Sequence, residues 1–73
     1  MRIQVKKSYK IIGFHKICPK NYMQRLLVLG FLPGSTFIVK NIAPLGNPYQ
    51  LFIRNCLVFL RKRDLDLIQV ENA

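Results

Sequence analysis

The segment YQLFIRNCLVFL, residues 49–60, constrains the fold more than any other part of the chain. It is apolar on both sides of one polar dipeptide, Arg54-Asn55. Asparagine tolerates the positive φ that a two-residue hairpin turn requires. The segment therefore predicts a β-hairpin in which Phe52 lies opposite Leu57.

The two faces of this hairpin follow from the alternation of side chains along each strand. One face, expected in the core, collects Tyr49, Leu51, Ile53, Cys56, Val58 and Leu60. The other face collects Gln50, Phe52, Leu57 and Phe59. The second face of an antiparallel hairpin usually meets water and is polar, yet this one is mostly large and apolar.

We call Phe52, Leu57 and Phe59 the apolar strip; Arg54 and Arg61 stand at its rim. If the strip is open to solvent, it is predicted to bind a partner protein or a second copy of the chain. The alternative is that the helix predicted below covers it.

The segment PKNYMQRLLVLG, residues 19–30, has the apolar spacing of a helix. Pro19 suits the first helical position, which makes Cys18 the N-cap, and Gly30 ends the helix. We expect three of its leucines to pack the helix onto the rest of the domain: Leu26, Leu27 and Leu29. Pro33-Gly34 then fits a type II turn.

The remaining segments predict three more strands: residues 8–15, residues 36–42, and a final strand through Ile68 and Val70. A short helical turn from Arg61 to Leu65, which Asp64 could cap, precedes the last strand. The prediction is a mainly β fold: a small β-barrel with one inserted α-helix and a short C-terminal helical turn. With 73 residues, the chain 1–73 is expected to be a single domain.

The chain is strongly basic, with 12 Lys and Arg against 3 Asp and Glu and a net charge of +9. Such a charge favours nucleic acid, an anionic membrane surface or an acidic protein as partner, against the alternative of a solvated surface. Phe52 and Phe59 could stack bases, but their face carries few hydrogen-bond donors. We therefore expect no nucleic-acid partner.

The residues that could carry chemistry do not form a recognisable set. A stable transition-metal site needs three or four converging ligands, whereas His15 and Cys18 form only a pair and Cys56 is distant in sequence. His15 is expected at the surface and Cys56 in the core. No hydroxyl is paired with a base, and no phosphate-binding loop is present. We predict no metal site, no cofactor and no enzymatic activity.

The N-terminal segment lacks the apolar core of a signal peptide, and no apolar run approaches the roughly 20 residues of a membrane span. We expect a cytoplasmic protein with reduced thiols.

Three stretches, LLVLGFLPGSTFIV, APLGNPYQL and LVFLRKRDLDLIQV, resemble the pattern of the FeoA family, ferrous iron transport protein A. The resemblance covers residues 19–70. It implies an SH3-like small β-barrel that acts in the cytoplasm with FeoB, a membrane permease that carries a GTP-binding domain. The chain departs from the pattern at Asn47, where Asp is usual, and at Asn55, where Gly is common.

The resemblance implies an accessory, non-catalytic role in ferrous iron uptake, by docking on the cytoplasmic part of the FeoB-type permease. The basic surface would favour the anionic inner face of the cytoplasmic membrane. The alternative function is a basic nucleic-acid-binding barrel. A third, a direct iron carrier, is opposed by the small number of metal ligands.

Overall fold

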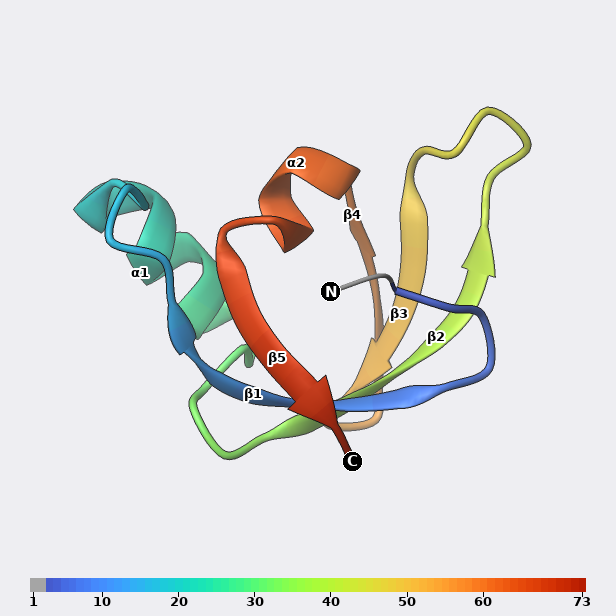
Figure 1. Cartoon of the computed structure of the whole chain (residues 1–73), viewed down its shortest axis with the longest axis horizontal. Coiled ribbons are helices and arrows are strands. Elements are labelled where there is room, and N and C mark those ends of the chain that lie inside the picture. Colours follow the sequence, from blue (N-terminus) through green and yellow to red (C-terminus); the bar gives the residue numbers. More distant parts are fainter. Residues whose placement is uncertain (1–2) are drawn as a thin grey trace.

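Five antiparallel strands form one strongly curved sheet in the order β4-β3-β2-β1-β5 (Figure 1). The computed structural model describes residues 3–73. Its elements are β1 (Ser8–Phe14), α1 (Lys20–Val28), β2 (Thr36–Ile42), β3 (Tyr49–Ile53), β4 (Cys56–Leu60), α2 (Lys62–Leu65) and β5 (Ile68–Asn72). The predicted mainly β fold, with a helix inserted after the first strand and a short one before the last, is confirmed. No helix within residues 3–73 is long and apolar enough to cross a bilayer.

The core lies on the concave side of this sheet and is built from alternate residues of every strand. Its fully buried members include Tyr9, Ile11, Phe31, Phe37, Val39, Leu51 and Ile53. Two aromatic contacts link three of them: Phe37 lies 5.8 Å from Tyr9 and 6.0 Å from Phe31, measured between ring centroids. Alternation along the strands therefore explains most of the core, to which α1 adds Leu26, α2 adds Leu65 and the loop after α1 adds Phe31.

The hairpin β3–β4 has the predicted register, with Phe52 opposite Leu57 and Gln50 opposite Phe59. Arg54 and Asn55 have φ values of 50° and 65°, as a type I′ turn requires. Asn55 thus adopts the left-handed conformation that glycine would otherwise provide at this position.

The placement of Cys56 in the core was wrong, because this residue is exposed. It is the first residue of β4, directly after the turn, and β4 is an edge strand of the sheet. Alternation gives the side of the strand on which a residue lies, but an edge position next to a turn has few neighbours to bury it.

The start of α1 differs by one residue from the prediction. Pro19 is extended, with φ −61° and ψ 145°, and is the N-cap, so the helix begins at Lys20. Cys18 precedes the cap, is buried, and its thiol donates a weak hydrogen bond to the Pro19 carbonyl at 3.7 Å. The fixed φ of proline, near −65°, is compatible both with an extended N-cap and with the first helical position, and the extended ψ of Pro19 makes it the N-cap.

The end of α1 is a Schellman motif built on Gly30, as the glycine predicted. Gly30 has a φ of 104° and donates to the Leu27 carbonyl, while the Phe31 N–H donates to the Leu26 carbonyl, both at 3.0 Å. Leu26 and Phe31 are buried, but Leu29 is 44% exposed, so its expected packing was wrong. The Schellman turn brings Phe31 into the core and leaves Leu29 outside.

The turn that follows also has the predicted geometry. Gly34 has a φ of 93°, and the Ser35 N–H donates to the Leu32 carbonyl at 2.9 Å across Pro33 and Gly34. The apolar segment around Gly30, Pro33 and Gly34 therefore serves to end α1 and to direct the chain into β2.

Candidate partner-binding site

The apolar strip lies on the convex side of the sheet and is open to solvent. Leu57 and Phe59 on β4 are 55% and 60% exposed, and Phe52 on β3 is half-buried. The alternative that α1 covers the strip is therefore wrong.

Two residues of β2 extend this surface. Ile38 lies opposite Phe52, so one outward row of three apolar side chains crosses β2, β3 and β4 and ends at Leu57. The Lys40 ammonium nitrogen lies 5.4 Å from the centroid of the Phe52 ring, within cation–π range. Sequence reasoning missed both neighbours because the register between β2 and β3 shifts between Val39 and Asn41, which alternation alone does not reveal.

Both rim arginines of the prediction are exposed, and they flank β4 at its two ends. Arg54 stands in the turn that opens β4, and Arg61 follows the last residue of that strand. The stem of Arg54 covers Gly30: a Cβ built there would lie 3.0 Å from Arg54 Cδ. The structure thus places Arg54 between the hairpin and the C-terminal end of α1.

A buried carboxylate connects α1 to α2 beside this surface. Asp64 accepts a hydrogen bond from the Tyr22 hydroxyl at Oδ1 and one from the Arg61 N–H, at 3.3 Å, at Oδ2. The second bond confirms that the Asp64 side chain caps the start of α2: Arg61 is the N-cap residue, and Asp64, at the third helical position, accepts its N–H. The hydrogen bond to Asp64, with burial and the nearby negative charge, raises the pKa of Tyr22 above its ordinary value.

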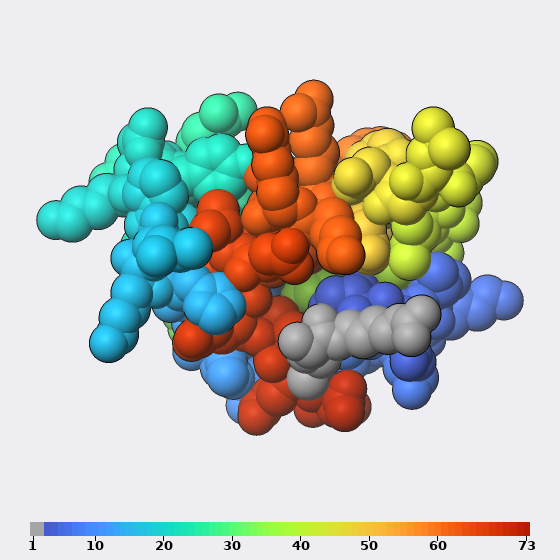
Figure 2. Space-filling model, turned by 45° about the horizontal axis from the view of Figure 1, so that its top comes forward, coloured from blue at the N-terminus to red at the C-terminus, as the bar shows by residue number. Residues whose placement is uncertain are grey.

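Asn47, where the family usually has Asp, has a structural partner. Its side-chain oxygen accepts a hydrogen bond of 2.7 Å from the Lys62 N–H, which ties the 43–48 loop to α2. Figure 2 shows α2 on one face of the molecule between α1 and this loop. The oxygen of Asn47 therefore holds the loop in place without an acidic charge.

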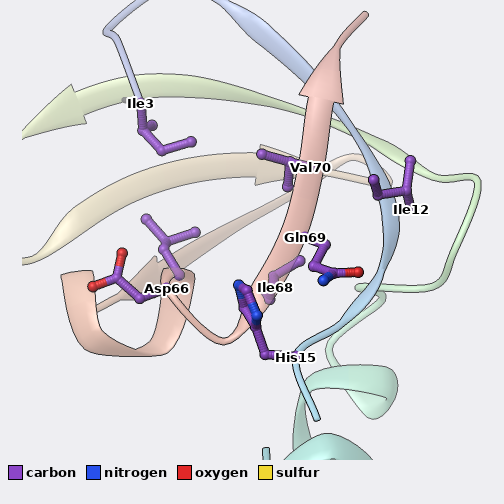
Figure 3. Close-up of a pocket in the computed structure, with 8 residues that line it drawn as sticks. Ile3, Ile12, His15, Asp66, Ile68, Gln69 and Val70 are labelled. Atoms are coloured by element: carbon purple, nitrogen blue, oxygen red, sulfur yellow. The ribbon is translucent and has the colours of Figure 1, made fainter. Parts of the chain in front are cut away.

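A hollow of about 390 Å³ lies between β1, β5 and α2, with His15 and Asp66 on its wall (Figure 3). His15 is exposed, as expected. The thiol of Cys18 is directed to a backbone carbonyl, and Cys56 lies on the hairpin. Within residues 3–73, no three His, Cys, Asp or Glu side chains are arranged to hold a metal ion.

The chain was compared with solved structures. It shares 40% identity with a Pseudomonas aeruginosa protein, with a TM-score of 0.73, over 93% of this chain and 91% of that one. It shares 32% identity with iron(II) transport protein A from Clostridium thermocellum, with a TM-score of 0.87, over 99% of this chain and 43% of that one.

A FeoA-like protein from Clostridium acetobutylicum is 26% identical, with a TM-score of 0.85, over 96% of this chain and 79% of that one. The family model of the FeoA domain matches residues 1–72. The predicted resemblance is thus confirmed over nearly the whole sequence, and the chain belongs to the FeoA family.

Proposed function

We propose that this protein is a non-catalytic accessory and regulatory protein of ferrous iron uptake that docks on the cytoplasmic part of a FeoB-type permease. FeoA family membership implies a role in ferrous iron transport. The observation that carries the docking step is the exposed apolar strip on the convex side of the sheet. Iron is the substrate of the permease in this proposal and is not held by the accessory chain.

The composition of the strip supports a protein partner. Exposed aromatic and aliphatic side chains that adjoin one another are typical of the centre of an interface, with polar residues at the rim. The row Ile38–Phe52–Leu57 spans roughly 10 Å at the usual strand spacing. Phe59 extends the patch along β4.

The charges around the strip favour an acidic partner. Lys40, Arg54 and Arg61 surround it, and the whole chain has only 3 acidic residues, of which Asp64 is buried. Opposite charges at the rim would steer the partner and fix its orientation. The same charges disfavour a second copy, since two chains of net charge +9 repel each other.

The backbone conformation of Arg54 is a further support. A non-glycine residue in the left-handed region costs on the order of 1 kcal/mol, and arginine lacks the short polar side chain that makes this region cheaper for Asn or Asp. The cost is consistent with a function for the guanidinium at this position.

The proposed location is the cytoplasm, at the inner face of the cytoplasmic membrane. The basic segment 61–63 lies at the start of α2 on the face seen in Figure 2, and anionic lipids attract basic residues near the bilayer surface. Membrane contact of this kind would concentrate the protein near the permease.

One observation favours the alternative of nucleic-acid binding. Lys40 lies over the half-buried ring of Phe52, and basic side chains beside aromatic ones are a combination that binds single-stranded nucleic acid. The two proposals differ in their dependence on salt. Binding to nucleic acid weakens steeply with added salt, whereas an apolar interface weakens much less.

The test is a calorimetric titration of the protein into the purified cytoplasmic part of the permease, at low and high salt. Single-stranded and duplex oligonucleotides serve as comparison ligands. Saturable binding to the permease fragment that survives high salt supports the proposal. Binding to an oligonucleotide alone, lost at high salt, contradicts it and supports the alternative.

A further inference from the structure

We infer that a groove between α1 and β4 receives one large apolar side chain from an acidic segment of the partner, with Arg25, Arg54 and Arg61 binding the carboxylates that flank it. The inference rests on the proposed function, because the acidic segment is assigned to the cytoplasmic part of the permease. It extends the docking surface from the flat strip around the edge of β4 to the inserted helix.

The walls of the groove come from two elements that are distant in sequence. Leu29 at the end of α1 and Phe59 on β4 form opposite walls, and both are substantially exposed. Leu26 and Leu60 are buried and form the floor. Phe59 therefore belongs both to the groove and to the apolar strip, which makes the two surfaces continuous.

The volume of the groove, about 180 Å³, suits one large side chain. An engineered protein cavity of about 150 Å³ holds a benzene molecule, which sets the scale for a phenylalanine or leucine side chain. An anchor side chain of this kind, placed in a preformed pocket, supplies much of the binding energy of many interfaces.

The polar end of the groove does not offer a free binding group. Tyr22 and Asp64 line this end, and both carboxylate oxygens of Asp64 already accept hydrogen bonds. Among the described residues, no buried side-chain nitrogen or oxygen lacks a partner. An apolar occupant therefore leaves no buried polar side-chain atom of the groove without a partner, while the exposed guanidinium of Arg25 stays available for a charged group beside that occupant.

The charges at the rim specify what flanks the anchor. Arg25 lines the groove from α1, while Arg54 and Arg61 stand at the two ends of β4. All three are exposed. A guanidinium binds a carboxylate through two parallel hydrogen bonds, so Asp or Glu on either side of the anchor matches this arrangement. A second copy of this chain would bring further positive charge to the same place.

The test uses the full chain labelled with ¹⁵N and a synthetic peptide in which one Phe stands between glutamates. The matched peptide has Ala in place of the Phe. We expect saturable amide shifts around Leu29 and Phe59 with the Phe peptide, and at least about tenfold weaker binding of the Ala peptide. Absence of shifts around the groove at millimolar peptide overturns the inference.

Two variants distinguish binding in the groove from nonspecific binding through charge attraction. Leu29→Ser removes one wall of the groove and is expected to lower the affinity for the Phe peptide by about tenfold. Val28→Ser is the control, because Val28 is the adjacent residue, is 87% exposed and does not line the groove. Equal binding by the two variants, with both folded by circular dichroism, overturns the inference.

The same variants, titrated into the cytoplasmic part of the permease, distinguish failure of the groove from failure of the proposed function. If the fragment binds wild type and Leu29→Ser equally, the groove inference fails and docking stands. If the fragment does not bind wild type, docking fails, and the peptide titration still decides the groove. If the amide shifts of the groove residues change with protein concentration in the absence of peptide, a second copy of the chain occupies the groove, and the inference is overturned.

Discussion

The hydrogen bond between Tyr22 and Asp64 links the inserted helix α1 to α2 through side chains distant in sequence. Tyr22→Phe removes the hydroxyl donor and keeps the ring. Asp64 would remain buried with Oδ2 still accepting from the Arg61 N–H, but Oδ1 would lose its donor. We expect this variant to lower the free energy of unfolding while leaving the fold intact.

The magnitude follows from the charge and burial of the pair. A hydrogen bond to a charged group contributes about 1.5–3 kcal/mol. Tyr22 is only half-buried, so water can partly replace its hydroxyl, and we expect a loss of about 1–2 kcal/mol at pH 7. For a domain of this size, each kcal/mol corresponds to roughly 4–8 °C in Tm.

The pH dependence has a definite sign. The hydrogen bond to Asp64, then burial, raises the pKa of Tyr22 in the folded state above the ordinary value near 10. A raised folded pKa means that the stabilisation is fully present below that ordinary value and is lost as pH rises through the folded pKa. The stability difference between wild type and Tyr22→Phe should therefore be constant from pH 7 to 9 and shrink above pH 10.

The assay is urea unfolding followed by circular dichroism at several pH values. Tyr49→Phe is the matched control, because the Tyr49 hydroxyl makes no side-chain hydrogen bond like that of Tyr22 within residues 3–73, and it should change stability by less than about 0.5 kcal/mol. Equal stability of Tyr22→Phe and wild type at pH 7 would refute the reasoning. So would a difference that does not shrink at high pH.

Three further variants test local features of the fold and the rim. Phe31→Ala should cost about 3–5 kcal/mol, because the ring is fully buried against Phe37; a clearly smaller loss on urea unfolding would contradict its place in the core. Gly30→Ala should cost more than Gly46→Ala, since both have positive φ but only the first would contact Arg54, and equal costs would contradict that contact. Arg54→Asn should raise the free energy of unfolding by about 0.5–1 kcal/mol, measured by thermal melts, because Asn adopts positive φ at lower cost. The same variant should bind the permease fragment more weakly in calorimetry, and unchanged binding would contradict a role of Arg54 in docking.

The parts of the fold that depend on local sequence were predictable. The Arg54-Asn55 turn fixed the hairpin register, because a two-residue turn leaves one pairing for the flanking residues. The helix end at Gly30 was predictable for a similar reason, since glycine adopts positive φ at low cost. Both features need only the residues next to them.

The errors concern positions that depend on distant neighbours. Leu29 has helical spacing but is the C-cap within the Schellman motif and stays exposed, while Phe31 after the motif takes the core position. Cys56 has the alternation of a core residue but stands on an edge strand. Ile38 and Lys40 could not be joined to the apolar strip without the pairing of β2 with β3, which contains a register shift.

The candidate site could be predicted only in part. The chemical character of Phe52, Leu57 and Phe59 was evident from alternation, but their exposure depends on where α1 lies. The groove between α1 and β4 had no sequence signal, because its walls come from residues 30 positions apart that only the folded chain brings together.

The most direct test of the docking proposal compares two double variants in binding to the cytoplasmic part of the permease. Phe52→Ser with Phe59→Ser disrupts the apolar strip. Ile17→Ser with Leu45→Ser is the matched control, because these residues are 82% and 96% exposed and lie outside the strip. Both proteins are first shown to be folded by circular dichroism.

We expect the strip variant to bind at least about tenfold more weakly than wild type and the control variant to bind as wild type does. Unchanged binding by the folded strip variant, or loss of binding by the control alone, would contradict docking through the convex face of the sheet.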